Sequence, residues 1–294
     1  MLFRSVVIDN GTGVIEDHFL LAVPGLQKDE AVAAAAKEIT DAVDAEYNEI
    51  FASTEVFLNG EKDPGNRTEE TNLGDLITDA MVWSVVSGGG LENMKEYADA
   101  PVLGITNGGS IRESIAIGDV TKNDVFTVLP FGNTVFVVYV TGTELLEALE
   151  ASTFCTPYEI GAYPQTSGIE WELDTTKEYD RGELYVLDGK ESSYYGPASI
   201  RRVSIKSVGG EPFDENATYA VVTNNFLAMG GDTYNVFNRA YSMGFGFDTG
   251  ILMDEAVVDY ITDVLGGVVG EQYASPSGNA VQILTDQEAK ESAG

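Results

Sequence analysis

Three short, glycine-rich turns carry aromatic and polar side chains out of otherwise apolar segments. They read NGGSIR at residues 107–112, LPFGN at 129–133 and FLAMGGD at 226–232. Each turn lies where a strand or short helix should end, so its side chains can project from a rigid frame into one shared cleft. Two flat rings can sandwich a planar heterocycle, while polar groups contact a sugar or an anion. The turns therefore predict a pocket for a ligand that has both parts.

The net charge draws attention to the arginines near these turns. The chain has 16 Lys plus Arg against 48 Asp plus Glu, a formal net charge of -32. Such a negative net charge argues against nucleic acid as a partner, because proteins bind nucleic acids by neutralising their phosphates. It also opposes long-range attraction of a small phosphate ester, so an anionic ligand would need a local arginine. Arg67 and Arg112 are the candidates, and Arg67 lies just before an expected helix N-terminus that favours an anion.

Histidine and cysteine are nearly absent, which limits the chemistry of the chain. His18 and Cys155 are single examples of their residue types. A catalytic zinc or two-metal site built on histidines is therefore excluded, and His18 is expected to be a surface residue. No Gly-x-Ser-x-Gly sequence supports a serine nucleophile, and one cysteine forms no internal disulfide. No apolar run is long enough for a membrane span, and the first residues lack a signal peptide.

The pattern of the remaining chain predicts a mixed α and β fold rather than a doubly wound parallel one, because several strands are joined by turns too short for crossovers. We expect an N-terminal hairpin with its turn at residues 10–13, and helices capped by Asp29, Asn72 and Asp254. Further helices are expected at 121–129 and 144–150. Strands are expected at residues 3–8, 14–21, 56–58, 102–106, 134–140, 200–205, 219–223 and 280–284, and around Trp171.

Residues 152–199 are the least clearly patterned part of the chain. They are rich in Gly, Pro, Tyr and acidic residues, with one clear strand. We interpret them as a surface excursion near the pocket. Its tyrosines, Tyr158, Tyr163, Tyr194 and Tyr195, could contact a ligand, but half-buried anchoring in loops is the commoner role of such residues.

Each turn also has a purely structural explanation. Asn and Gly adopt positive φ at little cost, so NGG can be an ordinary turn. Phe131 and Phe226 could be core rings at the ends of their elements, and Asp232 could bond its own backbone. Taken singly, these motifs do not distinguish a binding site from a scaffold.

Taken together and in chain order, the motifs resemble the C-terminal domain of the 5'-nucleotidase family. The resemblance rests on Arg67 with ETNLGD at residues 70–75, NGGSIR, VLPFGN at 128–133 and NFLAMGGD at 225–232. It extends from about Leu20 to Leu284. Two departures are Ser110, where the family usually has a third glycine, and Thr233, where it often has one after the aspartate.

The resemblance implies a division of labour between two domains. In that family an N-terminal metallophosphatase domain holds two divalent metal ions and the catalytic pair, and the C-terminal domain binds the nucleoside. This chain resembles the second domain, so we expect no cofactor and no catalytic residue in it, and no activity by itself. Residues 1–20 then resemble the end of the first domain or its linker, residues 21–285 the substrate-binding domain, and residues 286–294 a polar tail. Met1 would be the start of a fragment rather than a native terminus, and the location would be extracytoplasmic.

By position in the motifs, the resemblance also implies individual roles. Phe131 and Phe226 resemble the two rings that stack on the base, and Arg67 and Arg112 the contacts to ribose and phosphate. Asn107 resembles the asparagine at the base or ribose edge, and Asp232 the acceptor of the ribose hydroxyls. The expected partner is a nucleoside or nucleotide, with a purine favoured.

Two alternatives stay open at this point. The chain could be a non-catalytic surface or interaction module that kept the fold and lost the ligand. The enzyme could instead act on a sugar nucleotide, a cyclic nucleotide or an inorganic sulfur ester, although a small inorganic ligand has no flat face to stack on two rings.

Overall fold

A computed structural model describes residues 2–8, 15–22, 29–187 and 189–284. The chain divides into two compact units, Met1–Asn48 and Glu49–Gly294. The boundary between these units follows Asn48, and the substrate-binding domain expected from residue 21 stays a prediction.

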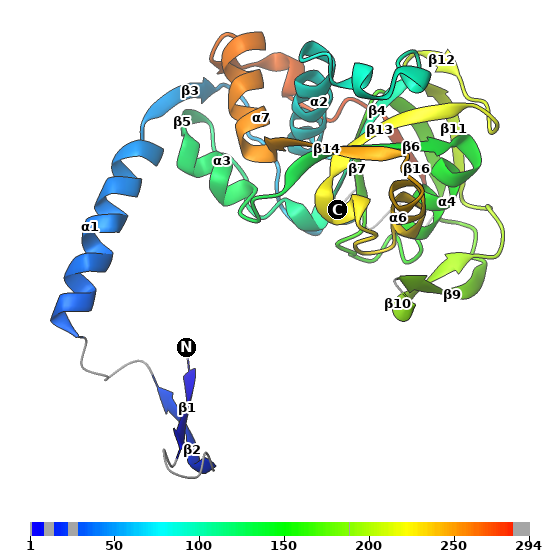
Figure 1. Ribbon diagram of the computed structural model, residues 1–294. Helices are drawn as coiled ribbons and strands as arrows, with labels where there is room; N and C mark the ends of the chain where they lie inside the picture. Colours follow the sequence, from blue (N-terminus) through cyan, green and yellow to red (C-terminus); the bar gives the residue numbers. More distant parts are fainter. Residues whose placement is uncertain (1, 9–14, 23–28, 188, 285–294) are drawn as a thin grey trace. The chain divides into compact units, whose positions relative to one another are not determined.

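The first unit holds a hairpin and one long helix. Strands β1 (Leu2–Ile8) and β2 (Ile15–Ala22) pair antiparallel, as expected (Figure 1). The predicted turn at residues 10–13 and the side chain of His18 lie outside what the structure describes. Helix α1 (Glu30–Tyr47) begins after Asp29, whose Oδ1 accepts the N–H of Ala31 at 2.9 Å. The predicted cap is therefore confirmed.

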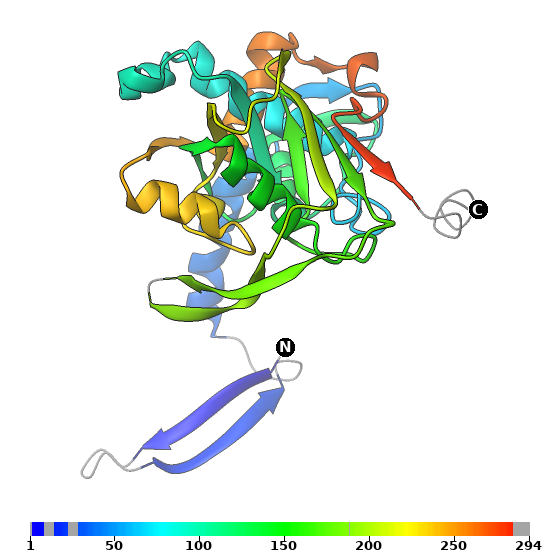
Figure 2. The same cartoon turned by 90° about the vertical axis from the view of Figure 1, so that its right-hand side faces the viewer.

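The second unit is built around a five-stranded sheet of mixed direction, in the order β14-β6-β13-β4-β7 (Figures 1 and 2). Its strands are β4 (Val102–Asn107), β6 (Thr134–Thr141), β7 (Pro164–Ser167), β13 (Thr218–Asn224) and β14 (Gly246–Leu252). Strand β13 runs parallel to β4, and the other neighbouring pairs are antiparallel. The predicted fold class, mixed-direction sheets flanked by helices, is confirmed.

Strand β6 explains why both faces of this sheet are covered. Successive side chains of a strand point to opposite faces. Val135, Val137 and Tyr139 belong to one buried cluster, whereas Phe136 and Val138 belong to a second. Each face therefore needs its own layer of helices.

The helices that cover these faces come from separate parts of the chain. Helix α2 (Asn72–Ser87) packs against β4, β7 and β13 on one face, together with α7 (Met253–Asp259), which lies beside α2 (Figure 1). Helices α4 (Gly142–Ser152) and α6 (Asn235–Ser242) pack on β6 and on each other. Among the described helices, none is long and apolar enough to cross a membrane.

Smaller sheets and helices complete the unit. A four-stranded sheet has the order β12-β11-β8-β16, a three-stranded sheet the order β15-β3-β5, and β9 and β10 form the yellow-green ribbon of Figure 2. Their bounds are β3 (Ile50–Thr54), β5 (Gly118–Thr121), β8 (Ile169–Asp174), β9 (Arg181–Leu187), β10 (Lys190–Pro197), β11 (Val203–Val208), β12 (Glu211–Pro212), β15 (Val268–Val269) and β16 (Ala280–Ile283). Short helices are α3 (Lys122–Val128), α5 (Asn225–Ala228), η1 (Gly90–Tyr97), η2 (Gly108–Ser110), η3 (Tyr260–Val264) and η4 (Glu271–Tyr273).

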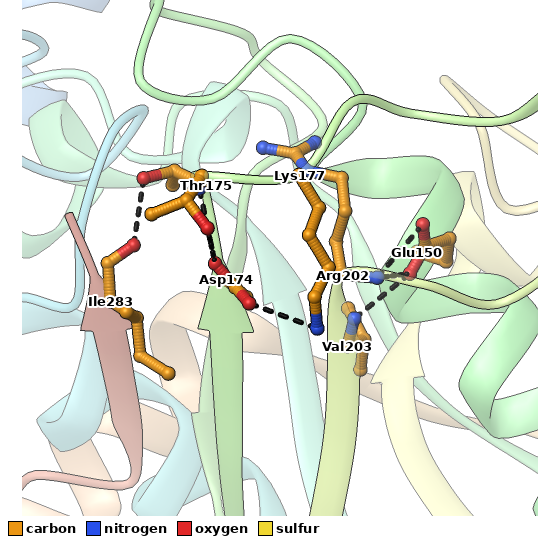
Figure 3. Close-up of polar contacts among 8 residues, drawn as sticks. Glu150, Asp174, Thr175, Lys177, Arg202, Val203 and Ile283 are labelled. Atoms are coloured by element: carbon orange, nitrogen blue, oxygen red, sulfur yellow. Dashed lines mark hydrogen bonds and ion pairs between the residues drawn. The ribbon is translucent and has the colours of Figure 1, made fainter. Parts of the chain in front are cut away.

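A buried carboxylate joins α4 to the start of β11. Glu150 is fully buried and accepts the backbone N–H groups of Arg202 at 3.0 Å and Val203 at 2.9 Å (Figure 3). The guanidinium of Arg202 turns inward and donates to the carbonyl oxygens of Thr153 and Thr156. These bonds compensate the cost of burying both charged groups. They also explain why β11 begins at Val203 rather than at residue 200, as the sequence analysis expects.

The C-terminal strand is held by backbone and side-chain contacts. The Oγ1 atom of Thr175 donates to the carbonyl oxygen of Ile283 at 2.8 Å, just beyond the ladder between β8 and β16 (Figure 3). The carboxylate of Glu70 accepts the N–H groups of Asn279 at 2.9 Å and Ala280 at 3.1 Å. The predicted strand at residues 280–284 is thus present.

Two predicted helix caps are wrong by one or two positions. Thr71, not Asn72, caps α2, and its Oγ1 accepts the N–H of Gly74 at 3.1 Å. The amide of Asn72 instead donates to the carbonyl oxygen of Tyr273 and ties α2 to the short helix η4. Helix α7 begins at Met253, so Asp254 lies in its first turn. The carboxylate of Asp254 in this first turn is still favoured by the positive end of the helix dipole.

Two strand predictions also differ from the structure. The strand expected at residues 56–58 lies earlier, at β3, and Leu58 forms an isolated bridge with Ile115. Residues 152–199 contain four strands, β7 to β10, rather than one. Tyr163 within them is fully buried and is a core residue, whereas Tyr158 is 78% exposed.

Candidate functional site

One edge of the central sheet brings the three turns together. Strands β4 and β13 are parallel, so their carboxyl ends meet at the same edge, and antiparallel β6 begins there. The turn at residues 107–112 follows β4, the turn at 129–133 leads into β6, and the segment 226–232 follows β13. Because carboxyl ends of neighbouring parallel strands often frame a ligand crevice, this edge is the expected place for a site.

A cavity of about 450 Å³ lies at this edge. Its lining residues are Arg67, Asn107, Gly109, Ser110, Arg112, Phe131, Asn133, Gly161, Phe226 and Asp232. All six candidate binding residues from the sequence analysis are among them. They come from the loop before α2, the end of β4 with the following η2 turn, the loop before β6, helix α5 and the loop after α5.

The two phenylalanine rings are accessible rather than part of the core. Phe131 is 58% exposed and Phe226 is 44% exposed. The guanidinium carbon of Arg112 lies 5.6 Å from the centre of the Phe131 ring, within the range of a cation–π contact. A side chain at Gly231 would place its Cβ 2.6 Å from the Phe226 ring, so the glycine leaves room for that ring. Both rings thus line the cavity and are accessible to solvent.

Asp232 is held in an uncommon backbone conformation beside a buried amide. Its φ is 52°, in the left-handed region that Asp and Asn tolerate better than most residues. Asn107 is 4% exposed, and its Nδ2 donates to Oδ2 of Asp232 at 3.0 Å. Burial raises the pKa of Asp232, while the bond from Asn107 and the positive charge of Arg67 act to lower it. A half-buried carboxylate therefore faces the cavity with one oxygen already bonded.

The two arginines reach the cavity from different loops. Arg112 is exposed, and its Nη1 donates to the carbonyl oxygen of Gly109 at 3.2 Å. Arg67 is half-buried, and its charge acts on Asp232. Local positive charge is therefore present in a strongly acidic chain, as the sequence analysis expects for an anionic ligand.

Four lining residues were not assigned a role from the sequence. Gly109, Ser110 and Asn133 belong to the turns that were singled out, whereas Gly161 had no recognisable signal. Gly161 reaches the cavity because its carbonyl oxygen accepts the N–H of Gly109 at 2.8 Å.

Gly108, beside these residues, is required by a close backbone approach. A Cβ at this position would lie 1.8 Å from the carbonyl oxygen of Asn66. The loop that carries Arg67 therefore packs directly on the turn that carries Asn107 and Arg112. Any larger residue at position 108 would separate the two loops and move these side chains apart.

Metal sites are usually built from several His, Cys, Asp or Glu side chains, and the lining of this cavity is different. Within the part of the chain that the structure describes, no three His, Cys, Asp or Glu side chains are grouped so as to hold a metal ion. The cavity itself has one carboxylate, Asp232, and two guanidinium groups. It fits an uncharged or anionic organic ligand better than a cation.

The sequence of the chain is similar to one family model and to several known proteins. Residues 50–239 match the family model for the 5'-nucleotidase C-terminal domain. The trifunctional nucleotide phosphoesterase protein YfkN of Bacillus subtilis is 38% identical over 195 residues, which are 66% of this chain and 11% of that protein. Protein UshA of Escherichia coli is 33% identical over 177 residues, which are 60% of this chain and 25% of that protein.

A solved structure extends the likeness to the fold. The 5'-nucleotidase precursor from Thermus thermophilus aligns with a TM-score of 0.65 and 30% identity, covering 97% of this chain and 50% of that one. The chain thus spans half or less of the length of these three relatives.

Proposed function

Because the chain belongs to the family of 5'-nucleotidase C-terminal domains, we propose that it is the nucleotide-recognition domain of a metal-dependent phosphoester hydrolase. The ligand is a nucleoside or nucleotide, with a purine favoured. One observation carries the proposal: six residues from separate segments of the chain line one cavity, and each has the chemistry that one part of a nucleotide requires.

The rings and the polar groups bind different parts of the ligand. Phe131 and Phe226 stack on the base, which gives affinity with little dependence on base identity. Asp232 accepts hydrogen bonds from the ribose hydroxyls, and Asn107 contacts the base or ribose edge. Arg67 and Arg112 bind the ribose and phosphate side, where a guanidinium can donate two bonds to one phosphate.

The chemical step belongs to a second domain. In the proposed enzyme, two divalent metal ions and the catalytic pair lie on an N-terminal metallophosphatase domain, and this chain alone releases no phosphate. The role of its residues is to hold the base and sugar so that the phosphate projects toward that domain. The enzyme is extracytoplasmic and takes part in nucleotide catabolism.

A calorimetric titration of the whole chain tests the proposal. Adenosine and adenosine monophosphate should bind with a dissociation constant below about 1 mM, whereas ribose 5-phosphate, thiosulfate and inorganic phosphate should bind far more weakly. The reason is that only the first two present a flat face to both rings. In a parallel assay with added Mn²⁺, the chain should release no phosphate from adenosine monophosphate.

Other outcomes separate the alternatives. If no nucleoside or nucleotide binds, the chain is a non-catalytic surface or interaction module. If thiosulfate binds as well as adenosine, the ligand is an inorganic sulfur ester. Tighter binding of a sugar nucleotide or a cyclic nucleotide than of adenosine monophosphate would keep the pocket and change the substrate.

The affinity for adenosine should fall as the pH is lowered. Protonated Asp232 no longer offers a second acceptor oxygen, and burial raises the pKa of this carboxyl group. Binding is therefore complete above the raised pKa and weakens as pH falls through it, at a higher pH than for an ordinary aspartate. We expect a loss of about tenfold at the acidic limit, measured by titration calorimetry between pH 4 and 8. The Asp232→Asn variant should show no such dependence, and a flat profile for the unmodified chain would contradict this role of Asp232.

A further inference from the structure

A line of buried amides connects the backbone of α5 to Asp232. The Oδ1 atom of Asn224 accepts the N–H of Leu227 at 2.9 Å and so caps the short helix that carries Phe226. The Nδ2 atom of Asn224 donates to Oδ1 of Asn107 at 3.2 Å. Nδ2 of Asn107 then donates to Oδ2 of Asp232 at 3.0 Å. Asn224 is fully buried and does not itself line the cavity.

The backbone N–H of Leu227, at the start of this series of hydrogen bonds, determines which group donates and which accepts in each later bond. A backbone N–H can only donate, so the oxygen of Asn224 must face Leu227 and its NH₂ group must face Asn107. The oxygen of Asn107 is then used, and its NH₂ group must face Asp232. Asp232 receives a donor on Oδ2, which leaves Oδ1 as an acceptor for the ligand.

A second branch satisfies the remaining donor of Asn224. Its Nδ2 also donates to Oγ1 of Thr106 at 3.1 Å. Oγ of Ser110 donates to the carbonyl oxygen of Asn107 at 2.7 Å, so the 3.1 Å contact between the two hydroxyls is donated by Thr106. Ser110, one of the departures from the family pattern, thus completes a network in which reversing one amide leaves a buried group unpaired. Such an error costs more than the bond itself contributes.

We propose that Asn224 is a positioning residue for the cavity. Its buried side chain caps the helix that carries Phe226. The same side chain sets the direction of the hydrogen bonds that leave Asp232 as an acceptor for the ligand. The inference rests on the proposed function in one respect, that the ligand donates hydroxyl hydrogens to Asp232. The bond direction itself is a property of the ligand-free protein and is testable without a ligand.

The Asn224→Asp variant separates the two tasks of this side chain. Aspartate caps a helix as well as asparagine does, so the contact with Leu227 is kept. It has no N–H to donate, so Asn107 must turn its NH₂ group toward position 224 and its oxygen toward Asp232. Two acceptors then face each other, which is relieved when Asp232 takes up a proton.

The first readout is the titration of Asp232 in the ligand-free chain, followed by carbon-13 NMR of its carboxyl group. We expect Asn224→Asp to raise the pKa of Asp232 by about one unit or more. The groups around Asp232 are Arg67 and Arg112 at the cavity, Tyr194 on β10 and Tyr234. Burial raises the pKa of both tyrosines, so between pH 4 and 9 the titration reports the carboxyl group.

The second readout is adenosine affinity in a double-mutant cycle. Asn224→Asp should weaken binding about tenfold at pH 7.5, and the loss should extend to higher pH than in the unmodified chain. Adding Asp232→Asn should recover part of the affinity, because an amide at position 232 can donate to the turned Asn107. The double variant should bind at least about threefold more tightly than independent effects predict.

Two results would overturn the inference. In the first, the titration curve of Asp232 in the Asn224→Asp variant is the same as in the unmodified chain. In the second, the effects of Asn224→Asp and Asp232→Asn on adenosine affinity are additive. If Asn224→Asp does not fold, Asn224→Ser replaces it, since serine also caps the helix but is too short to reach Asn107. Affinity of Asn224→Ser equal to that of the unmodified chain would then refute the inference. Failure of the unmodified chain to bind adenosine would instead refute the proposed function, and the ligand-free titration would still decide the role of Asn224.

Discussion

Replacing Phe131 and Phe226 by alanine is expected to remove most of the affinity for adenosine while leaving the fold intact. Stacking of a base on one aromatic ring contributes on the order of 1 to 3 kcal/mol, about 5- to 150-fold in affinity. Both rings are substantially exposed, so truncating them leaves no internal cavity. Each single variant should therefore weaken binding within that range, and the double variant should lose both contributions.

Titration calorimetry of the four proteins, with thermal unfolding as a check on the fold, measures this result. A matched control is Phe57→Ala, because Phe57 is 48% exposed and does not line the cavity. It should leave the affinity unchanged. The stacking role fails if adenosine binds equally well to both single variants, or if Phe57→Ala weakens binding as much as they do.

The Asp75→Asn variant is expected to be more stable than the unmodified chain at pH 8, but not at pH 4. Oδ2 of Asp75 accepts the N–H of Ser277 at 2.8 Å, whereas Oδ1 is buried and finds no donor among the described residues. Burial, together with the negative charge of Glu70, raises the pKa of Asp75 to about 8. The folded chain thus holds a proton that the unfolded chain releases at neutral pH.

The sign of the effect follows from this difference in protonation. A raised pKa in the folded state stabilises the protein fully below the pKa of the unfolded chain, and that stability is lost as pH rises toward about 8. The loss between pH 4 and 8 is on the order of 3 to 5 kcal/mol. Asparagine can accept from Ser277 and donate to Glu70 at every pH, so the variant should avoid this loss.

Urea unfolding of both proteins across this pH range provides the measurement. Glu96 in η1 is a suitable control, because it is exposed and Glu96→Gln removes one negative charge without touching a buried carboxylate. The control should follow the unmodified chain at each pH. Parallel stability curves for Asp75→Asn and the unmodified chain would contradict the assignment.

The residues that line the cavity were easier to predict from the sequence than the loops that complete it. The cavity residues stand in short motifs at element ends, and a motif carries its own local signal. The capping boxes at the starts of α3 and α4 are equally local, so both helices were placed correctly. Gly161 had no such signal, because it reaches the cavity only through pairing with a turn more than fifty residues away.

Long-range contacts also explain the errors in the fold. The start of β11 depends on the carboxylate of Glu150, and the position of Asn72 depends on the carbonyl oxygen of Tyr273. Residues 152–199 were difficult because β7 and β8 pair with strands that lie far along the chain. In each case the interacting residue lies far away in the sequence, so the local sequence pattern did not reveal it.

Strand β14 determines how the chain can be shortened for crystallisation or biotechnology. A fragment that stops after α6 keeps every lining residue of the cavity, yet it lacks β14 and exposes one side of β6, whose sequence is TVFVVYVT. An uncovered strand so rich in valine and aromatic residues invites copies of the fragment to add to one another and precipitate. In the whole chain β14 covers this side of β6, and its own register is interrupted between Asp248 and Leu252. A recombinant fragment should therefore retain at least β14, which ends at Leu252.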